Sequence, residues 1–595
     1  MKKIILFVVI GLNAQYLHAQ ETYSKAVAAQ INQVENHLAG NIKIEGRPDY
    51  NILDRMAYYK VKGLSVAVIQ DYKVVWAKGY GWADEQEKRP VTTRTLFEPG
   101  SISKSLNSMA VLKLVQDQKL DLYTDINTYL SSWKFPYDSV SKNKKITLAN
   151  LLSHTAGLSV HGFGGYNREE PIPTVPQILD GKSPANSPAV RSLFEPGLQF
   201  KYSGGGTTIS QLIITDVTHL PYDQYLARNV FEPLGMRNTF FTQPPPDDRL
   251  RELATGYRDD GSMVAGKFHV YPEQGAAGLW TTPSDLCQYI IETQLAYEGR
   301  SAKVLDQATT RLRLTPYIDE SAALGVFIEK RGGIRYFQHG AGNEGFRGMY
   351  YGSLEGGNGV AVFVNSDDGR IMAELINSVA TVYHWKGFYQ PTVKKEVKVP
   401  EPVLQKYTGV YLADGNLGNI IKEKDGYYYA TADGYNKMHF SGPADFFNLE
   451  SVVEKHFTTD ATGRVTGFTR ANNGNPLPAA VKVANPDTLT GPEEMFNAMG
   501  WTLLIHQRYA EAMTCLKRGI ALYPGSLLIA GNLAHCYLFS NDYNNAINIY
   551  QAHMGQTLNG GNASWSDMIR QDFAYFKGKG MDQHAMDKVM ADLKL

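Results

Sequence analysis

Apolar and polar residues along this chain follow two periods, one typical of helices and one typical of strands. Helical patterns at residues 23–38 and 50–60 precede LSVAVIQDYKVVWAKGYG, in which two β-rich runs flank a polar turn and predict a hairpin. Between residues 323 and 365, short runs such as ALGVFIEK, IRYFQH and GVAVFVN alternate with Gly-rich turns that allow only antiparallel connections. We therefore predict an α+β fold of the α/β-sandwich type, an antiparallel sheet flanked by helices and interrupted by a helical subdomain.

The pattern changes after the first predicted domain, residues 20–388. The stretch YQPTVKKEVKVPEPVLQKY places three prolines among charges and shows neither period, so we expect a linker over residues 389–402. Residues 403–486 form short, aromatic, alternating runs broken by ADGN, KDG and ATG. Such runs predict a small all-β domain that resembles a barrel.

The C-terminal segment, residues 490–595, contains an internal repeat with an offset of 34 residues. That period is typical of tetratricopeptide helix pairs, and it predicts an all-α helical-repeat domain. Two interpretations stay open: a groove that binds a protein partner, or helices that merely pack on the β domain. The matching positions are Gly500 with Ala534, Leu503 with Tyr537, Tyr509 with Tyr543, Ala512 with Ala546, and Leu516 with Tyr550.

The first residues follow the pattern of a secretory signal peptide. Lys2 and Lys3 precede an apolar run from Ile4 to Leu12, and small or apolar residues then fit a cleavage site, so we assign residues 1–19 to the signal. No later run reaches eighteen apolar residues, and no cysteine follows the first run. We expect a periplasmic or secreted protein without a membrane span or a lipid anchor.

Charge and cysteine content narrow the possible partners. The chain has 59 basic and 59 acidic residues, evenly spread, which argues against a nucleic-acid partner. Cys287 fits a small buried side chain, whereas Cys515 and Cys536 would pair only if their helices pack together, and their spacing leaves this open.

The candidate chemistry begins at FEPGSISKSLN. Ser101 follows a Pro-Gly turn at the start of a predicted helix, and Lys104, three residues later, should lie on the same face. Backbone N–H groups at a helix N-terminus favour a developing oxyanion. A serine nucleophile also needs a group that accepts its proton. This motif alone therefore favours the simpler interpretation, a helix cap followed by a solvated lysine.

Other motifs strengthen the interpretation. FKYSGGG contributes Tyr202 and Ser203, and FQHGAGNEGF places His339 on an expected edge strand; LLSHTAGL, FEPLGM and YPEQGAAGLWTTPSDL also agree. In this order, the motifs resemble those of serine β-lactamase-like hydrolases. The group includes class C β-lactamases, D-specific aminopeptidases, carboxypeptidases and related esterases, and the resemblance covers about residues 50–385.

The resemblance implies roles for specific residues. Ser101 would be the acylated nucleophile, Lys104 its charged neighbour, and Tyr202 the general base, since a nearby ammonium favours a phenolate. The backbone N–H groups of Ser101 and Gly342 would form the oxyanion hole. The remaining substrate-contact candidates are Ser203, Gly204, Gly340, Ala341, His339 and Arg347.

Two positions depart from the family pattern. Gly204 stands where β-lactamases have an asparagine, and Ala341 stands where a glycine is usual. The family has a lysine or a histidine at the position of His339, and this chain has the histidine. Neutral imidazole holds a carboxylate weakly, so we expect an amide or ester substrate without an obligatory carboxylate. Arg347 is a candidate for a nearby cation.

No metal or cofactor is expected, because the sequence lacks H-E-x-x-H and C-x-x-C motifs. His154 is expected to be a hydrogen-bonded structural residue. The leading hypothesis is an exported serine hydrolase that acts through an acyl-enzyme on a small-molecule or peptide substrate, such as a D-amino-acid or cell-wall peptide. A carboxylesterase or weak β-lactamase is the alternative, and a non-catalytic, penicillin-binding-like sensor is the alternative of another class.

Overall fold

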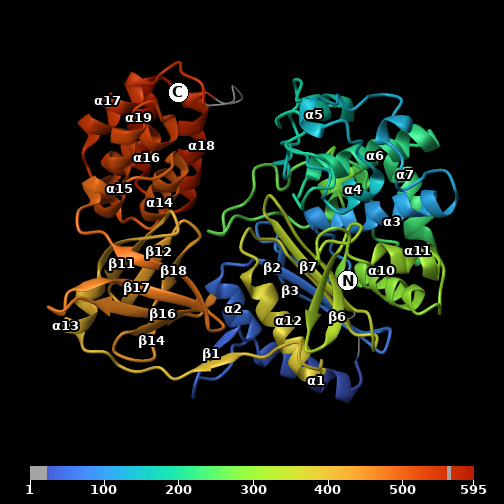
Figure 1. Cartoon of the computed structure of the whole chain (residues 1–595), viewed down its shortest axis with the longest axis horizontal. Coiled ribbons are helices and arrows are strands. Elements are labelled where there is room, and N and C mark those ends of the chain that lie inside the picture. Colours follow the sequence, from blue (N-terminus) through green and yellow to red (C-terminus); the bar gives the residue numbers. More distant parts are fainter. Residues whose placement is uncertain (1–22, 559–563) are drawn as a thin grey trace, which may run out of the picture.

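The computed structural model describes residues 23–558 and 564–595 (Figure 1). The predicted signal peptide, residues 1–19, lies outside the described residues. Within the described ranges, no helix is both long enough and apolar enough to cross a bilayer.

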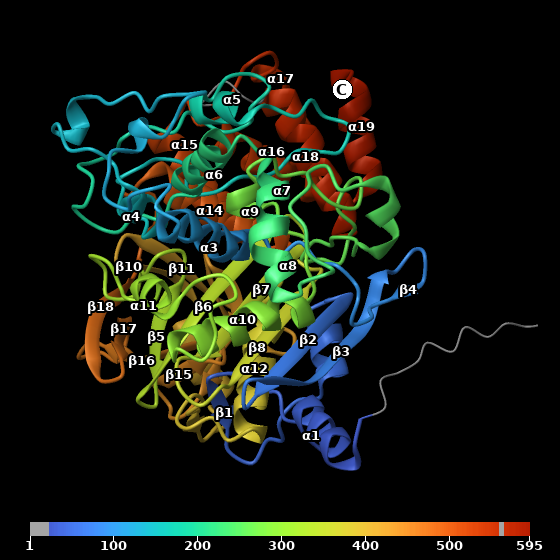
Figure 2. The same ribbon diagram turned by 90° about the vertical axis from the view of Figure 1, so that its right-hand side faces the viewer.

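The first unit is built on a seven-stranded antiparallel sheet with the order β4-β3-β2-β8-β7-β6-β5. Helices cover both of its faces and a helical subdomain interrupts it, so the predicted α+β architecture is confirmed (Figures 1 and 2). The strands are β2 (Gly63–Gln70), β3 (Lys73–Asp84), β4 (Arg89–Pro90), β5 (Phe327–Arg331), β6 (Ile334–Asn343), β7 (Phe346–Ser353) and β8 (Gly359–Val364).

Strand β2 shows why the sheet sits between two helical layers. Its residues are buried on both faces, and alternate side chains join different cores. Val66 and Val68 pack with α1 (Lys25–Asn36) and α12 (Arg370–Val382), whereas Ala67 and Ile69 join the large core beneath the helical subdomain. Burial of one such aliphatic side chain contributes about 1.5–3 kcal/mol to the stability of the folded state.

The helical subdomain connects β4 to β5 and lies above one end of the sheet (Figure 2). It begins with a short 3-10 turn, η1 (Gly100–Ile102), that runs into α3. Its helices are α3 (Ser103–Gln116), α4 (Leu148–Leu152), α5 (Val175–Asp180), α6 (Gly204–Thr218), α7 (Tyr222–Leu226), α8 (Glu232–Leu234), α9 (Gln274–Ala277), α10 (Pro283–Tyr297) and α11 (Gln307–Arg313). The short helix α2 (Ile52–Tyr58) precedes β2.

The segment expected to be a linker contains regular structure. Strand β9 (Thr392–Lys394) pairs in parallel with β1 (Ile42–Ile44), and α13 (Glu401–Leu404) begins before residue 402. The absence of a local period was therefore misleading here, because the partner strand lies about 350 residues earlier in the sequence.

The second sheet has nine antiparallel strands in the order β13-β12-β11-β10-β18-β17-β16-β15-β14. Its two end strands follow one another in sequence, so the sheet curves back on itself as the barrel-like prediction expects. The strands are β10 (Gly409–Ala413), β11 (Asn416–Glu423), β12 (Gly426–Thr431), β13 (Gly434–Lys437), β14 (His439–Phe440), β15 (Asp445–Asn448), β16 (Ser451–Thr459), β17 (Val465–Asn472) and β18 (Asn475–Lys482).

In the described part of the C-terminal segment, six helices stand on one end of this sheet (Figure 1). The first two pairs begin 34 residues apart, and the small residues Ala512 and Ala546 are fully buried where the helices approach. Cys515 and Cys536 are both free and buried. The helices are α14 (Glu493–Ile505), α15 (Tyr509–Leu522), α16 (Leu527–Phe539), α17 (Tyr543–Ala552), α18 (Trp565–Gly578) and α19 (Gln583–Leu593).

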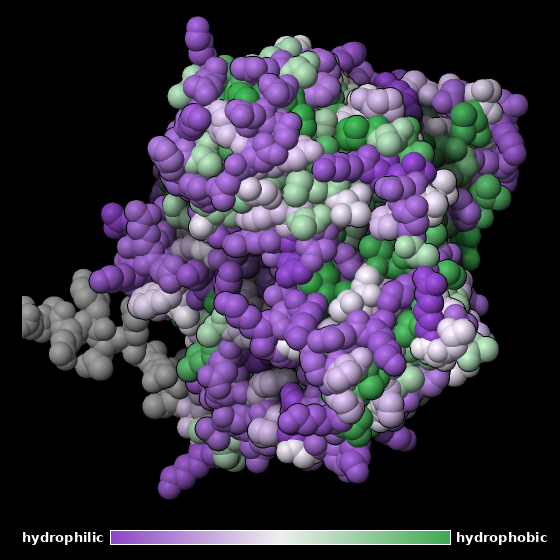
Figure 3. All heavy atoms as spheres, turned by 90° about the vertical axis from the view of Figure 1, so that its left-hand side faces the viewer, coloured by the Kyte–Doolittle hydropathy of each residue, from purple (hydrophilic) through white to green (hydrophobic). Residues whose placement is uncertain are grey.

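The helices and the nine-stranded sheet share one hydrophobic core. Leu417, Ile421 and Ala430 of the sheet belong to the same cluster as Phe496 and Trp565 of the helices. The outer face of these two units is mostly hydrophilic, with apolar side chains in small groups (Figure 3). The tetratricopeptide assignment and a protein partner for this surface stay predictions.

Candidate active site

Ser101 lies in the 3-10 turn η1, directly before α3. Gly100 has a φ of +50°, and a Cβ there would come within 2.7 Å of the Asn343 side chain and 2.9 Å of the Gly342 carbonyl carbon. Only glycine fits this close approach without strain. The turn thus brings Ser101 against the end of strand β6.

Lys104 lies one turn into the helix on the same side as Ser101. Its Nζ donates hydrogen bonds to the Ser101 Oγ at 3.0 Å and to the Ala276 carbonyl at 2.7 Å. The side chain is 3% exposed, and within the described residues it has no carboxylate partner. A buried ammonium without a counter-charge favours a nearby group that can become anionic.

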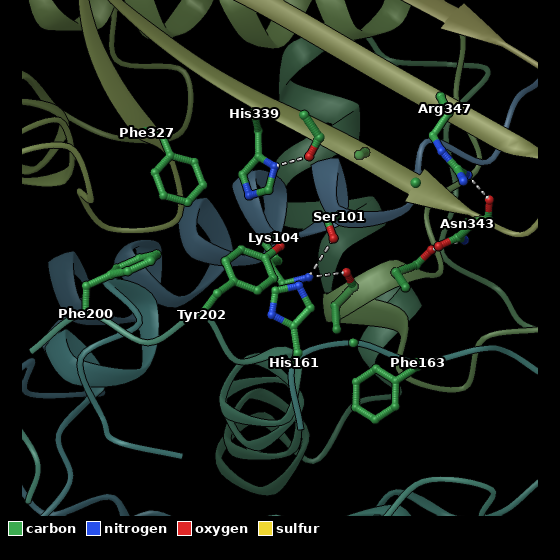
Figure 4. A pocket seen from close by; sticks show the side chains of 16 residues that line it. Ser101, Lys104, His161, Phe163, Phe200, Tyr202, Phe327, His339, Asn343 and Arg347 are labelled. Carbon is green, nitrogen blue, oxygen red and sulfur yellow. Dashed lines mark hydrogen bonds between the residues drawn. The ribbon is translucent and has the colours of Figure 1, made fainter. Parts of the chain in front are cut away.

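Tyr202 is the aromatic group next to this ammonium. The Lys104 Nζ lies 5.1 Å from the centre of its ring, and Figure 4 shows the ring pointing toward Lys104 and Ser101. His154 stacks behind the ring at 4.2 Å and accepts a hydrogen bond from the Ser203 backbone N–H at Nδ1. His154 is buried and hydrogen-bonded, as expected, and it holds the Tyr202 ring in place.

His339 closes the opposite side of the site on strand β6. Its Nδ1 lies 2.6 Å from the Gly340 carbonyl, so Nδ1 carries the proton. Its Nε2 is buried and has no hydrogen-bond partner in the described residues. Burial and the Lys104 charge lower the pKa of His339 to about 3. The imidazole therefore offers an acceptor nitrogen instead of a cation at neutral pH.

Strand β6 is not the edge strand, because β5 lies outside it. The expectation of an edge strand is therefore wrong for β6 as a whole. Pairing with β5 nevertheless ends at Gln338, so the stretch from His339 to Asn343 extends beyond it.

These side chains line one pocket of about 710 Å³ (Figure 4). Three phenylalanines form an apolar part of the wall, and none of the sixteen lining residues carries a carboxylate. The lining residues are Ser101, Lys104, His161, Gly162, Phe163, Phe200, Tyr202, Ala276, Ala277, Phe327, His339, Gly340, Ala341, Gly342, Asn343 and Arg347.

Two residues proposed as substrate contacts lie elsewhere. The Ser203 hydroxyl caps α6, where it accepts from the Gly206 N–H at 3.0 Å and donates to the Ser159 carbonyl at 2.7 Å. Gly204 faces the back of the pocket wall, since a Cβ there would lie 3.1 Å from both the His161 carbonyl and the Phe163 ring. The loop that carries His161 thus fills the space beside Gly204.

Arg347 lines the pocket, but its charge is already paired. Its guanidinium forms an ion pair with Asp367 at 3.0 Å and donates to the Asn343 carbonyl at 2.6 Å. These contacts brace the turn after β6, so the geometry does not favour Arg347 as a free cation for a substrate carboxylate.

No sequence motif pointed to five other residues that line the pocket: His161, Phe163, Phe200, Phe327 and Asn343. The His161 ring lies 4.8 Å from the Tyr202 ring. A single histidine within a glycine-containing loop carries no spacing signal. The hydrogen bond from the Gly204 N–H to the His161 carbonyl, at 2.9 Å, helps to fix its place.

Comparison with known proteins identifies the family. Residues 49–381 match the family model described as Beta-lactamase. The chain belongs to the β-lactamase family.

The relatives of this β-lactamase-family chain match only parts of it. "Protein flp" of Staphylococcus aureus strain N315 is 29% identical over 228 residues, 38% of this chain and 42% of the relative. The chain thus spans less than half the length of that relative. "Putative penicillin-binding protein PbpX" of Bacillus subtilis strain 168 is 26% identical over 333 residues, 54% of this chain and 76% of that protein.

One solved structure supports the fold. The octameric penicillin-binding protein homologue from Pyrococcus abyssi aligns with a TM-score of 0.51 and 20% identity, covering 72% of this chain and 98% of that one. Within the described residues, no group of three or more His, Cys, Asp or Glu side chains is placed to hold a metal ion.

Proposed function

We propose that this chain is an exported serine hydrolase that cleaves an uncharged ester or amide through an acyl-enzyme. The observation that carries the proposal is the hydrogen bond between the Lys104 ammonium and the Ser101 hydroxyl in a pocket that also contains Tyr202. This arrangement supplies a nucleophile, a fixed charge and a phenol that can accept a proton.

The proposed reaction has two steps, acylation of Ser101 and hydrolysis of the acyl-enzyme, and the same groups act in both. The Ser101 Oγ attacks the substrate carbonyl while its proton passes to the oxygen of Tyr202, whose ring centre lies 5.1 Å from the Lys104 ammonium. The backbone N–H groups of Ser101 and Gly342 stabilise the oxyanion, and the leaving group departs with the proton that Tyr202 received from Ser101. Water then attacks the acyl-enzyme along the same proton path.

The pocket supports a substrate without a negative charge. His339 presents a neutral acceptor nitrogen, and the Arg347 charge is paired with Asp367. The phenylalanines Phe163, Phe200 and Phe327 favour an apolar acyl or leaving group. Amides of D-amino acids or D-configured peptides and simple carboxylesters satisfy these conditions.

β-Lactam capture is the second candidate function. The match to the penicillin-binding protein PbpX over 333 residues favours it. A β-lactam carries a carboxylate, and the present pocket offers it only Lys104, which is already bonded to Ser101 and Ala276. We therefore expect slow acylation by penicillins. The corresponding non-catalytic function is that of a sensor, which is acylated by a β-lactam but does not hydrolyse the acyl-enzyme.

The test is a substrate panel with the wild type and Ser101→Ala. We expect hydrolysis of p-nitrophenyl esters or D-amino-acid amides that disappears in the variant, with penicillin a poor substrate. A clear preference for penicillin over every neutral substrate would contradict the proposed specificity. A stable adduct without turnover of any substrate would favour the sensor.

A further inference from the structure

Glu98 is a buried acid that the proposed mechanism does not use. It lies three residues before Ser101, and its side chain is fully buried. The backbone on its N-terminal side is fixed, because Phe97 exchanges hydrogen bonds with Thr281 at 2.9 and 3.0 Å. The carboxyl group is therefore held at the base of the turn that presents the nucleophile.

The Glu98 carboxyl group meets two neutral amides. Gln243 donates to its Oε1 at 3.2 Å, and the Asn343 amide lies beside the carboxyl group. Its Oε2 has no partner in the described residues. An ionised carboxylate with a bare oxygen would be costly here, so burial raises the pKa of Glu98 well above its usual range. The titratable group Tyr271 interacts with Glu98, and burial raises the pKa of Tyr271 too.

Asn343 connects this acid to the oxyanion side of the pocket. Its Nδ2 donates to the Ala277 carbonyl at 2.9 Å, and its side-chain oxygen lies against Gly100. The neighbouring Ala276 carbonyl accepts from Lys104. Asn343, the last residue of strand β6, thus contacts both the Ser101 turn and helix α9.

We propose that Glu98, as the neutral acid, is a positioning residue that ties the Ser101 turn to the Asn343 end of β6. This contact sets the spacing between the backbone N–H groups of Ser101 and Gly342. The role rests on the proposed function, because those two groups are its oxyanion donors. Glu98 itself touches no reacting atom.

The first test compares Glu98→Gln with Glu98→Ala. Glutamine keeps a neutral donor and acceptor of the same shape, so kcat/KM should stay within a few-fold of wild type. Alanine should lower kcat by about 10²–10³-fold with little change in KM, the loss expected when an oxyanion donor moves. Glu292→Ala is the matched control, since Glu292 is equally buried on α10 outside the pocket and should lose stability but keep kcat.

Equal losses in the glutamine and alanine variants, or wild-type kinetics in both, would overturn the proposal. A second measurement does not depend on activity. The infrared difference spectrum of wild type minus Glu98→Gln at pH 7 should show the C=O band of a protonated carboxyl group, and carboxylate bands in its place would overturn the proposal. If the wild type lacks Ser101-dependent turnover but shows this band, the proposed function fails while the neutral state of Glu98 stands. The positioning role is then tested by a crystal structure of Glu98→Ala, which should show Asn343 displaced from Gly100. An unmoved Asn343 would reject the positioning role.

Discussion

Tyr202 and Lys104 are the residues whose geometry decides the chemistry. The phenol ring is held from behind by His154 and lies 5.1 Å from the Lys104 ammonium at its ring centre. The ring position therefore depends on stacking, whereas the proposed proton transfer depends on the hydroxyl alone. A single-atom substitution separates the two contributions.

Tyr202→Phe should keep the fold and lose the chemistry. Removal of a general base typically lowers the rate by about 10²–10⁴-fold, and we expect that loss in kcat with the best ester of the panel. The melting temperature should change little, because the ring still stacks on His154. Steady-state kinetics with thermal denaturation checks both, and full activity in this variant would exclude Tyr202 as the base.

His339 should make the stability depend on acid pH. Its folded pKa of about 3 lies below the ordinary histidine value, so between about pH 3 and 6.5 the unfolded chain binds more protons than the folded one. The free energy of unfolding should therefore rise with pH across this window. His339→Gln should flatten this part of the curve in urea titrations from pH 4 to 7; an unchanged slope would show that His339 is charged in the folded protein.

The residue types of the site were predictable, but their surroundings were not. Ser101, Lys104, Tyr202 and His339 could be found because the motifs have fixed spacing, and the structure gathers them in one pocket. The pairing of Arg347 with Asp367, and the hydrogen bond from the Ser203 hydroxyl to the Ser159 carbonyl, depend on contacts between distant segments. No local pattern in the sequence encodes those contacts.

At the scale of elements, the 3-10 turn before α3 determines how closely Ser101 approaches β6. Gly100→Ala would combine a positive φ with contacts under 3 Å to Asn343 and Gly342. We expect a loss of about 1–3 kcal/mol in stability and a larger loss in kcat, because the turn must move. Kinetics and chemical denaturation measure the two effects.

Gly235→Ala is the control for that substitution. Gly235 has a φ of +73°, but no atom of the described residues lies within 4 Å of the position that a Cβ would take, so alanine carries the backbone cost without the clash. The free energy of unfolding of this variant should fall by about 1 kcal/mol, and its activity should be unchanged. Equal activity of both alanine variants would show that the Gly100 approach does not position Ser101.

Elements with a strong local period were predicted, and those defined by distant pairing were not. The β2–β3 hairpin and the strands from β5 to β8 follow from alternation and Gly-rich turns. Strand β9 pairs with residues near the N-terminus, and β5 covers only part of β6, so both depend on tertiary contacts. The wrong expectation of an edge strand has this cause, and strand β9 within the predicted linker was missed for the same reason.

At the scale of the whole molecule, the nine-stranded sheet and the C-terminal helices should unfold together. Their shared core includes Leu417 and Ile421 of the sheet and Trp565 of the helices. Trp565 is fully buried, and its Nε1 donates to the Tyr550 carbonyl at 2.9 Å. The β-lactamase-family unit has separate cores on its own sheet.

Trp565→Ala should therefore lower the midpoint temperature of one calorimetric transition and leave that of another unchanged. Truncation of a buried tryptophan costs about 3–5 kcal/mol, which should shift the transition shared by the sheet and helices. Ester hydrolysis should persist above that shifted transition. Separate melting of the nine-stranded sheet and the helices, by calorimetry and circular dichroism, would contradict the shared core.

The order of the three units was visible in the sequence because each has its own period. The offset of 34 residues even gives the starts of four C-terminal helices. The shared core between sheet and helices was not predictable, because apolar positions in the sequence do not identify the partner they pack against.

The most direct test of the central claim is to locate a covalent label. The protein is treated with a fluorophosphonate probe, and peptide mass spectrometry locates the adduct in wild type, Lys104→Ala and Tyr202→Phe. We predict one adduct, on Ser101, formed at least tenfold more slowly in both variants, a change of about 1.4 kcal/mol in activation free energy. A label on another residue, or equal labelling rates in all three proteins, would contradict the account.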